Sequence, residues 1–262
     1  MIKVNGIKLI LEHFPDGTLH LKEEIPVTDS ARITWRYEDN EELLALYFIT
    51  RHLQERGVER ICLIMPYIPN ARQDRAKSSG DIFTLKYFAD IINSLKFSSV
   101  VVRDPHSYVS EALFNNLTVL SNSTLVDMTI RDIDDAKLTL FFPDEGAMKR
   151  YSSEINMPYI FGMKKRDWET GKILGLDVIG DASLIKDKNI LIVDDICSRG
   201  GTFYHSAKRL KELGANKIYL FVTHCENTIL EGELLTSGLV EKVYTTNSIF
   251  TREHERIKVF NV

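Results

Sequence analysis

The stretch that decides the fold is ILIVDDICSRGGT, residues 190–202, where an apolar run leads through two acids into a Ser/Gly-rich turn. Four consecutive aliphatic residues predict a buried parallel strand over residues 190–193, and the helical spacing of the apolar residues that follow predicts a helix that ends at Gly214. The N-terminus of such a helix directs backbone N–H groups and the positive end of its dipole at an anion. The stretch therefore predicts a phosphate-binding turn.

Two sets of residues in this stretch have different tasks. Gly200 and Gly201 remove the Cβ atoms that would keep a phosphate away from the backbone, so residues 198–202 are the candidate phosphate site. Asp194 and Asp195 come at the carboxyl end of the strand, well placed to accept hydrogen bonds from sugar hydroxyls. An ordinary strand-to-helix turn is the alternative, but two adjacent acids after a buried strand are costly unless they have partners.

The composition is that of a globular protein. Of 262 residues, 44% are hydrophobic and 27% are charged, which suits one large or two medium domains. No apolar run approaches the ~20 residues of a membrane helix, and the N-terminal sequence lacks the features of a signal peptide, so we expect a cytoplasmic protein with no membrane partner. A net charge of −4 gives no overall attraction to nucleic acid, and the three cysteines show no metal-ligand spacing.

The order of the predicted elements is that of an α/β protein. Residues 1–40 contain short antiparallel strands. The chain then alternates strands with helices, which is typical of parallel sheets with helices on both faces. The acidic run at residues 128–135 interrupts this pattern, and we expect two domains, 1–128 and 129–262. Strands are predicted over residues 60–65, 100–102, 138–142, 159–162, 190–193, 218–222 and 243–245, and helices over residues 41–57, capped by Asn40, and 83–96.

Two segments of the first half carry candidate ligand-binding residues, because ligands bind at the carboxyl ends of parallel strands. The loop at residues 65–80 places Arg72 beside Gln73, and a planar guanidinium beside an amide suits both polyphosphate and purine edges. Lys77, in the same loop, is interpreted as a solvated cation. After the next strand, His106 stands close to Asp104, where it suits a metal ion or a phosphate.

Two segments of the second half complete this set. Asp144 closes a strand directly before a helix. Acids at strand ends that face basic loops indicate a hydrated Mg²⁺ bridging phosphates, because this metal keeps waters and takes few protein oxygens. Lys164, Lys165 and Arg166 begin a polar stretch, 162–172, without strong periodicity, which we interpret either as a mobile catalytic flap or as a charged surface loop. Phosphoryl transfer needs cations that neutralise developing charge, which favours the flap.

Ordered motifs over nearly the whole chain resemble those of the ribose-phosphate diphosphokinases, also called phosphoribosyl pyrophosphate synthetases. The ARQDR run with a downstream histidine is specific to that family, whereas phosphoribosyltransferases also carry the acidic glycine loop. The motifs are HFPDG (13–17), PYIPNARQDR (66–75), DPHS (104–107), PDEGAMKR (143–150), KKR (164–166) and VDDICSRGGT (193–202).

The resemblance implies two phosphoribosyltransferase-like halves, each a mainly parallel sheet flanked by helices, with the active site between them. The implied reaction is attack by the anomeric hydroxyl of ribose 5-phosphate on the β-phosphorus of ATP, which transfers diphosphate and releases AMP. A homo-oligomer is also implied, because a loop from a neighbouring subunit, with Phe14 and Asp16, completes the adenine site. The implied ATP-binding residues are Phe14, Asp16, Arg72, Gln73 and Arg75.

The same resemblance implies roles for the remaining candidates. His106 and Asp144 attend Mg²⁺, with Asp104 near a second ion. Charge neutralisation and in-line positioning supply most of the catalysis in such a reaction. The catalytic residues are Lys164, Arg166 and His106, the ribose hydroxyls are bound by Asp194 and Asp195, and the 5-phosphate by Ser198, Arg199, Gly200, Gly201 and Thr202.

Other functions remain open at this point. A type I phosphoribosyltransferase uses the same phosphate turn but consumes phosphoribosyl pyrophosphate, and a catalytically silent partner subunit or a ligand-sensing regulator of nucleic acid needs no catalytic cations. The Arg72 loop and His106 speak against the first alternative, and Lys164 speaks against a silent subunit. Thr18 stands where many family members have glutamate, so the nucleotide preference also stays open.

Overall fold

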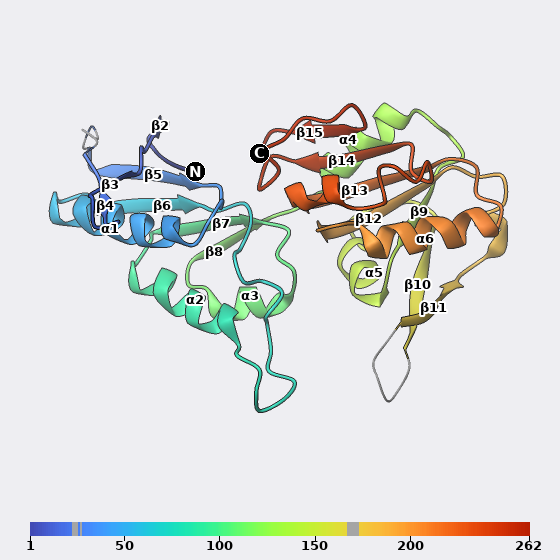
Figure 1. The fold of residues 1–262 in the computed structure, drawn as a ribbon, viewed down its shortest axis with the longest axis horizontal. Coiled ribbons are helices and arrows are strands. Elements are labelled where there is room, and N and C mark those ends of the chain that lie inside the picture. The colour runs from blue at the N-terminus through green and yellow to red at the C-terminus, as the bar shows by residue number, and fades with distance from the viewer. Residues whose placement is uncertain (23–25, 27, 167–172) are drawn as a thin grey trace. The chain divides into compact units, whose positions relative to one another are not determined.

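The computed structural model describes residues 1–22, 26, 28–166 and 173–262 (Figure 1). The chain divides into two compact units, unit 1 (Met1–Ser121) and unit 2 (Asn122–Val262). The expected boundary between residues 128 and 129 falls inside a helix, α4 (Ser123–Ile133). This helix belongs to unit 2 because its buried Leu125 and Val126 pack in the same core as strand residues of that unit. Among the described residues, no helix is long and apolar enough to cross a membrane.

The sheet of unit 1 begins antiparallel and continues parallel. Its strands are β1 (Ile2–Val4), β2 (Ile7–Lys8), β5 (Ser30–Trp35), β6 (Arg60–Ile64), β7 (Ser99–Arg103) and β8 (Leu117–Leu120), and a separate hairpin consists of β3 (Glu12–His13) and β4 (Leu19–His20). The order in the sheet is β2-β1-β5-β6-β7-β8. β1 runs antiparallel to β2 and β5, as expected for the N-terminal segment, whereas β5 to β8 are parallel.

The helices of unit 1 cover one face of this sheet (Figure 1). They are α1 (Glu41–Glu55), α2 (Thr84–Ser94) and α3 (Tyr108–Leu113), and they follow β5, β6 and β7 in turn. Because each new strand is added on the same side and such crossovers are right-handed, successive helices fall on the same face. On β5, Ala31 and Ile33 are buried in the core that forms there, together with Leu63 of β6, whereas Arg32 points to the opposite face and is exposed. Unit 1 thus departs from the expectation of helices on both faces.

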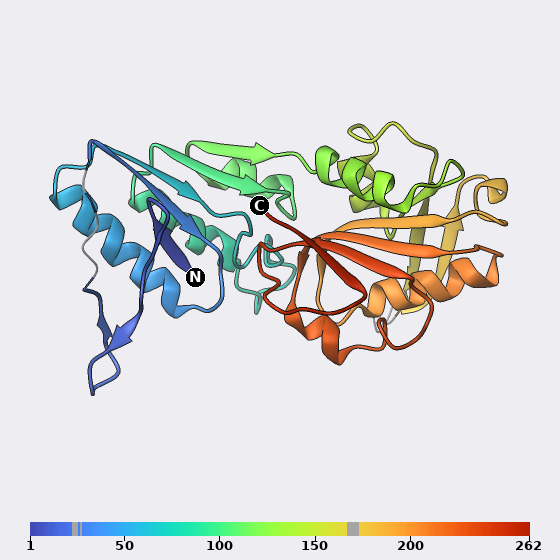
Figure 2. The same ribbon diagram turned by 90° about the horizontal axis from the view of Figure 1, so that it is seen from above.

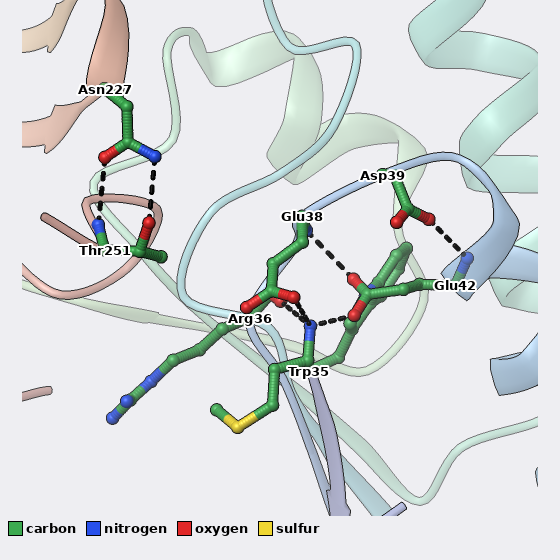
Figure 3. Close-up of polar contacts among 8 residues, drawn as sticks. Trp35, Arg36, Glu38, Asp39, Glu42, Asn227 and Thr251 are labelled. Atoms are coloured by element: carbon green, nitrogen blue, oxygen red, sulfur yellow. Dashed lines mark hydrogen bonds and ion pairs between the residues drawn. The ribbon is translucent and has the colours of Figure 1, made fainter. Parts of the chain in front are cut away.

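The start of α1 is held by a buried acid (Figure 3). Glu42 accepts hydrogen bonds from the indole N–H of Trp35 and the backbone N–H of Glu38, both at 2.9 Å. Asp39 Oδ1 accepts from the backbone N–H of Glu42 at 3.2 Å. Asn40, the predicted cap, makes no side-chain capping bond, so Asp39 rather than Asn40 satisfies the first turn.

The sheet of unit 2 is mostly parallel with an antiparallel edge. Its strands are β9 (Thr139–Phe142), β10 (Tyr159–Arg166), β11 (Ile173–Ile179), β12 (Ile190–Cys197), β13 (Ile218–Cys225), β14 (Lys242–Thr246) and β15 (Ile257–Phe260). The order is β11-β10-β9-β12-β13-β14-β15, with β10 and β11 forming an antiparallel hairpin. The predicted flap segment therefore begins as a strand that extends through Arg166, with a shift of register between Lys165 and Arg166, rather than as an irregular loop.

Helices cover both faces of this sheet, as expected, and bury two cores. They are α4 and α5 (Glu145–Tyr151) on one face and α6 (Gly201–Glu212) on the other. Figure 2 shows α4, in green, and α6, in orange, on opposite sides of the strands. Phe142 and Val193 point into the core beneath α4 and α5, whereas Phe141 and Ile192 point into the core beneath α6. Short 3-10 turns, η1 (Ala182–Leu184) and η2 (Asn227–Glu231), lie in the connections.

One polar pair fastens the segment after β14 to η2 (Figure 3). Asn227 Nδ2 donates to the hydroxyl of Thr251 at 2.9 Å, and the backbone N–H of Thr251 donates to Asn227 Oδ1 at 3.1 Å. Both groups of the amide are thereby satisfied within unit 2. Two hydrogen bonds therefore fix the start of η2 to the segment after β14. The loop after η2 supports the phosphate turn described below.

Candidate functional site

Asp194 and Asp195 lie in the C-terminal half of β12, a strand with a neighbour on each side. β12 pairs in parallel with β9 and with β13, and Asp195 is 3% exposed. The chain runs from β9 to β10 on one side, and β12 then pairs with the other side of β9. This is a topological switch point, the position at which open α/β sheets bind ligands. The fold therefore places the predicted sugar-binding acids where a ligand site is expected.

Arg150 of α5 joins the two acids. Its Nη2 donates to Asp194 Oδ1 at 3.1 Å and to Asp195 Oδ1 at 2.8 Å. The pKa of the Asp194 carboxyl is nevertheless raised well above its usual range, because burial disfavours its charge and the Asp195 carboxyl lies beside it. The motif at residues 143–150 contained Arg150, but sequence reasoning gave it no role. The signal was a basic residue at the end of the helix that follows the Asp144 strand.

The predicted phosphate turn leads directly into α6. Gly200 is the N-cap in the left-handed region, with φ of 79°, and contributes no side-chain cap. The first helical bond runs from the N–H of Tyr204 to the carbonyl of Gly200 at 2.8 Å, so the N–H groups before Tyr204 have no partner inside the helix. A Cβ on Gly201 would meet nothing within 4 Å. The turn thus presents open backbone with the geometry expected of an anion site.

A glycine missed by sequence reasoning supports this turn from behind. A Cβ on Gly232 would lie 1.9 Å from the backbone carbonyl oxygen of Arg199, a distance that no side chain tolerates. The Arg199 side chain is exposed and pairs with Glu231 at 3.0 Å. The loop after η2 therefore fixes the backbone of the turn, and Glu231 offsets the added positive charge that Arg199 was expected to contribute.

Cys197 ends β12 opposite Cys225 of β13 in the strand register. Both thiols are free and buried. The pKa of the Cys197 thiol is raised well above its usual range by a hydrogen bond with Cys225 and by burial. A thiol whose ionisation is disfavoured is a poor nucleophile, so Cys197 is a core residue beside Cys225.

The strands next to β12 end at the other predicted residues of unit 2. Asp144, after β9, caps α5 by accepting from the backbone N–H of Ala147 at 3.1 Å, and its charge also raises the pKa of Asp194. Lys164 and Arg166 lie on β10, but their side chains are outside the part of the chain that the structure describes. β10 packs closely there, since a Cβ on Gly162 would lie 2.8 Å from the carbonyl of Pro143.

In unit 1, the loop at residues 65–80 is tied down at its start and exposed at its centre. Tyr67 and Ile68 are buried, whereas Arg72 and Gln73 are exposed. The side chain of Gln73 accepts from the hydroxyl of Thr84 at 2.6 Å, at the start of α2. The predicted nucleotide-binding side chains therefore lie on an exposed part of a loop that is fixed by buried residues and by the contact with α2.

Asp74 links this loop to the histidine segment, and sequence reasoning overlooked it. Arg75 donates to both of its carboxylate oxygens, at 2.8 and 3.1 Å. This pairing, with a hydrogen bond to Ser107 and the nearby charge of His106, holds the pKa of Asp74 below its usual value. Asp74 itself is 5% exposed. Asp104 begins the same segment in a left-handed conformation, with φ of 46°.

The hairpin with Phe14 and Asp16 is exposed and internally bonded. Phe14 is 48% exposed and stacks on His20 with ring centroids 4.2 Å apart. Asp16 Oδ1 accepts from the backbone N–H of Thr18 at 3.0 Å and from its hydroxyl at 2.7 Å, and these bonds lower the pKa of Asp16. Thr18, which departs from the family pattern, thus closes the turn that presents Phe14.

Two further observations bear on the predicted ligands. Among the described residues, no group of three or more His, Cys, Asp or Glu side chains is arranged to hold a metal ion. An open hollow of ≈ 680 Å³ lies on the uncovered face of the unit 1 sheet, lined by residues that include Arg32, Arg60 and Ser98. The residues predicted for substrate or metal binding do not line it, so this hollow does not mark the candidate site.

Comparison with known proteins agrees with these features. Residues 2–95 match the family model of the N-terminal domain of ribose phosphate pyrophosphokinase, and residues 143–261 match that of the phosphoribosyl synthetase-associated domain. The ribose-phosphate pyrophosphokinase of Saccharolobus solfataricus is 27% identical over 99% of this chain and 90% of the relative. That of Thermococcus kodakarensis is 28% identical over 94% of this chain and 88% of the relative.

A solved structure shows the same fold. Phosphoribosylpyrophosphate synthetase from Mycobacterium smegmatis superposes with a TM-score of 0.80 at 20% identity, covering 97% of this chain and 86% of that one. The two family models account for most of both units, and the relatives align over nearly the full length. The chain therefore belongs to the ribose-phosphate pyrophosphokinase family.

Proposed function

We propose that this protein is a ribose-phosphate diphosphokinase, which transfers the β,γ-diphosphate of Mg-ATP to the C1 hydroxyl of ribose 5-phosphate. One observation carries the proposal for this chain. A buried carboxylate pair and an uncapped helix N-terminus follow one another on β12 and α6, at a topological switch point. Together they suit a sugar that carries hydroxyls at one end and a phosphate at the other.

In the reaction, the anomeric oxygen forms a bond to the β-phosphorus while the bond between that phosphorus and the oxygen bridging to the α-phosphorus breaks. AMP leaves with the bridging oxygen, and the hydroxyl proton is released. Asp194 and Asp195 orient the ribose hydroxyls, and residues 198–202 hold the 5-phosphate, which fixes C1 for in-line attack. Lys164 and Arg166 neutralise the charge that develops on the transferred group.

Unit 1 supplies the nucleotide contacts in this proposal. Arg72, Gln73 and Arg75 bind ATP from the loop after β6, and Phe14 stacks on the adenine with Asp16 beside it. The exposed, hairpin-borne ring of Phe14 supports this role, because aromatic faces stack well on nucleobases. Arg75 keeps a fixed orientation through its bidentate pairing with Asp74.

The metal of the proposed enzyme is Mg²⁺. The residues fit it: Asp144 and Asp104 provide hard oxygen donors, and a magnesium ion that bridges substrate phosphates needs only one or two carboxylates. His106 and Asp144 would hold it, with Asp104 near a second ion. Bound there, the metal would neutralise phosphate charge.

The decisive measurement is AMP release from ATP that depends on both ribose 5-phosphate and Mg²⁺. Formation of phosphoribosyl pyrophosphate in the same reaction identifies the transfer. Consumption of phosphoribosyl pyrophosphate with a free base would instead indicate a phosphoribosyltransferase, although the match of residues 2–95 favours synthesis. No AMP under any metal or phosphate condition would leave only a silent subunit.

A homo-oligomer and a cytoplasmic location belong to the same proposal. If the Phe14 hairpin completes a neighbour's site, Phe14→Ala and Lys164→Ala subunits should complement one another. Mixing the two variants after reversible dissociation then restores activity, because some sites receive both native residues. Activity that stays at the level of the separate variants would place Phe14 in the site of its own subunit.

A further inference from the structure

Arg150 is built into the sugar-binding part of the candidate site. One nitrogen, Nη2, donates to both acids, at 3.1 and 2.8 Å, and both bonds use the Oδ1 atom of the carboxylate. Its side chain is 17% exposed, so the pair is screened from water far more than a surface ion pair. The contact joins α5 to the end of β12, two elements far apart in the sequence.

We propose that Arg150 is a positioning residue for sugar recognition, whose guanidinium gathers the Asp194 and Asp195 carboxylates into one acceptor for neighbouring hydroxyls of a pentose phosphate. The inference rests on the proposed function of this site and adds a determinant of its sugar specificity. Arg150 acts through the two acids and makes no contact with the reacting atoms.

The surroundings hold Arg150 in place. Asp144 fixes the first turn of α5 through the N–H of Ala147. A Cβ on Gly146 would lie 3.2 Å from Asp144 Oδ1 and 3.8 Å from Arg150 Nη1, so Gly146 leaves room for both groups. The guanidinium also lies over the ring of Tyr151, 5.5 Å from its centroid. Helix, cap and aromatic ring therefore direct one cation at the two acids.

The need for this cation follows from the acids themselves. Two carboxylates beside each other in a buried position repel, and without a counter-charge one of them takes up a proton. A protonated carboxyl becomes a donor and loses acceptor capacity. Arg150 counteracts the burial and the Asp195 charge that raise the pKa of Asp194, and its two contacts engage both Oδ1 atoms on one side, which orients the two groups toward neighbouring hydroxyls.

A site built to accept from hydroxyls rejects an analogue that lacks one, because its acceptor is then left unpaired. The test is equilibrium binding, by calorimetry, of ribose 5-phosphate and 2-deoxyribose 5-phosphate to the full-length protein and to Arg150→Gln. We expect the native protein to prefer ribose 5-phosphate at least ~10-fold, and Arg150→Gln to lose that preference while its affinity for inorganic phosphate at the turn is unchanged. Arg150→Lys, which keeps the charge, should recover part of the preference.

The matched control is Lys149→Gln. This residue precedes Arg150 on α5, and its substitution makes the same charge change, but its partner is the exposed Glu145 one turn earlier, at 2.6 Å. Its preference should stay native. The proposal is overturned if the native protein binds both sugars equally, if Arg150→Gln keeps the preference, or if Arg150→Gln loses phosphate binding to the same extent. Because binding needs no turnover, native protein that shows the preference but releases no AMP would refute the proposed function alone.

Discussion

Unit 1 and unit 2 present their candidate residues on different kinds of structure. In unit 2, the acids lie in a buried strand end between two parallel neighbours, and their counter-charge comes from the adjacent helix. In unit 1, the candidates stand on an exposed hairpin and an anchored loop. The difference follows from topology, since consecutive strands in unit 1 create no switch point, whereas unit 2 reverses direction at β9. In the proposed enzyme, the sugar would thus be recognised by residues at the edge of a core and the nucleotide by surface segments.

In unit 2, we expect the largest effect on catalysis from the proposed catalytic lysine on β10. Lys164→Ala should lower kcat by ~10²–10³-fold, because it removes a charge that acts on the transition state, with little change in ATP binding. Steady-state kinetics and ATP calorimetry test this, with Lys149→Ala as the exposed control. Equal losses in kcat and in ATP affinity would make Lys164 a binding residue only.

Two glycine substitutions, one behind the phosphate turn and one within it, should distinguish structural support of the turn from phosphate binding. Gly232→Ala should destabilise unit 2 by ~1–3 kcal/mol, because its Cβ would collide with the carbonyl of Arg199. Gly201→Ala faces open space, so it should leave the unfolding midpoint native yet weaken ribose 5-phosphate binding. Thermal unfolding with sugar-phosphate titration measures both, and a stable Gly232→Ala would refute the supporting contact.

In unit 1, the loop that carries Arg75 should depend on one acid. Asp74→Asn should cost ~1 kcal/mol of stability at pH 7 and raise the KM for ATP, because it releases Arg75 from its charged partner. The folded pKa of Asp74 is depressed, so its contribution is full above the unfolded pKa of ~4 and is lost as the pH falls through the lower folded value. Denaturant unfolding from pH 7 to pH 3 should show the gap between native and variant closing only below ~4.

A small effect on stability is expected at the exposed hairpin. Phe14→Ala should change the free energy of unfolding by less than ~1 kcal/mol, since the ring loses only its stacking on His20. The KM for ATP should still rise ~10-fold if the ring stacks on the adenine. A native KM would remove Phe14 from the site, and a large loss of stability would remove the contrast between the two units.

Much of unit 2 could be predicted because its signals are local. The apolar run before Asp194 and the glycines after Ser198 encode a strand, a turn and a helix within a few residues. The acidic run at residues 128–135 was interpreted as a break between domains, but it forms part of α4. Its charges hide the buried residues of that helix, Leu125, Val126 and Thr129. Similarly, the charged residues at 164–166 hide the extension of the strand predicted over 159–162, which pairs with the next segment of the chain.

What sequence reasoning missed depends on contacts between distant segments. Arg150 meets Asp194 and Asp195, which lie 44 and 45 residues further along the chain, and Gly232 meets the turn only because the loop after η2 folds back onto it. Asp74 pairs with the adjacent Arg75, and the charge of His106, in the segment after β7, also lowers its pKa. None of these pairings leaves a periodic or spaced pattern in the chain. The contacts that these residues make could therefore be identified only from the three-dimensional structure.

The position of β12 between β9 and β13 also orders the events of synthesis. The parallel strands of unit 1 pair in the order in which they leave the ribosome, so this half can form as it emerges. In unit 2, by contrast, the β10–β11 hairpin is synthesised between β9 and its other neighbour, β12. A nascent chain halted before Ile190 thus carries Arg150 with neither of its acids, so the proposed sugar site cannot form until synthesis has passed Asp195.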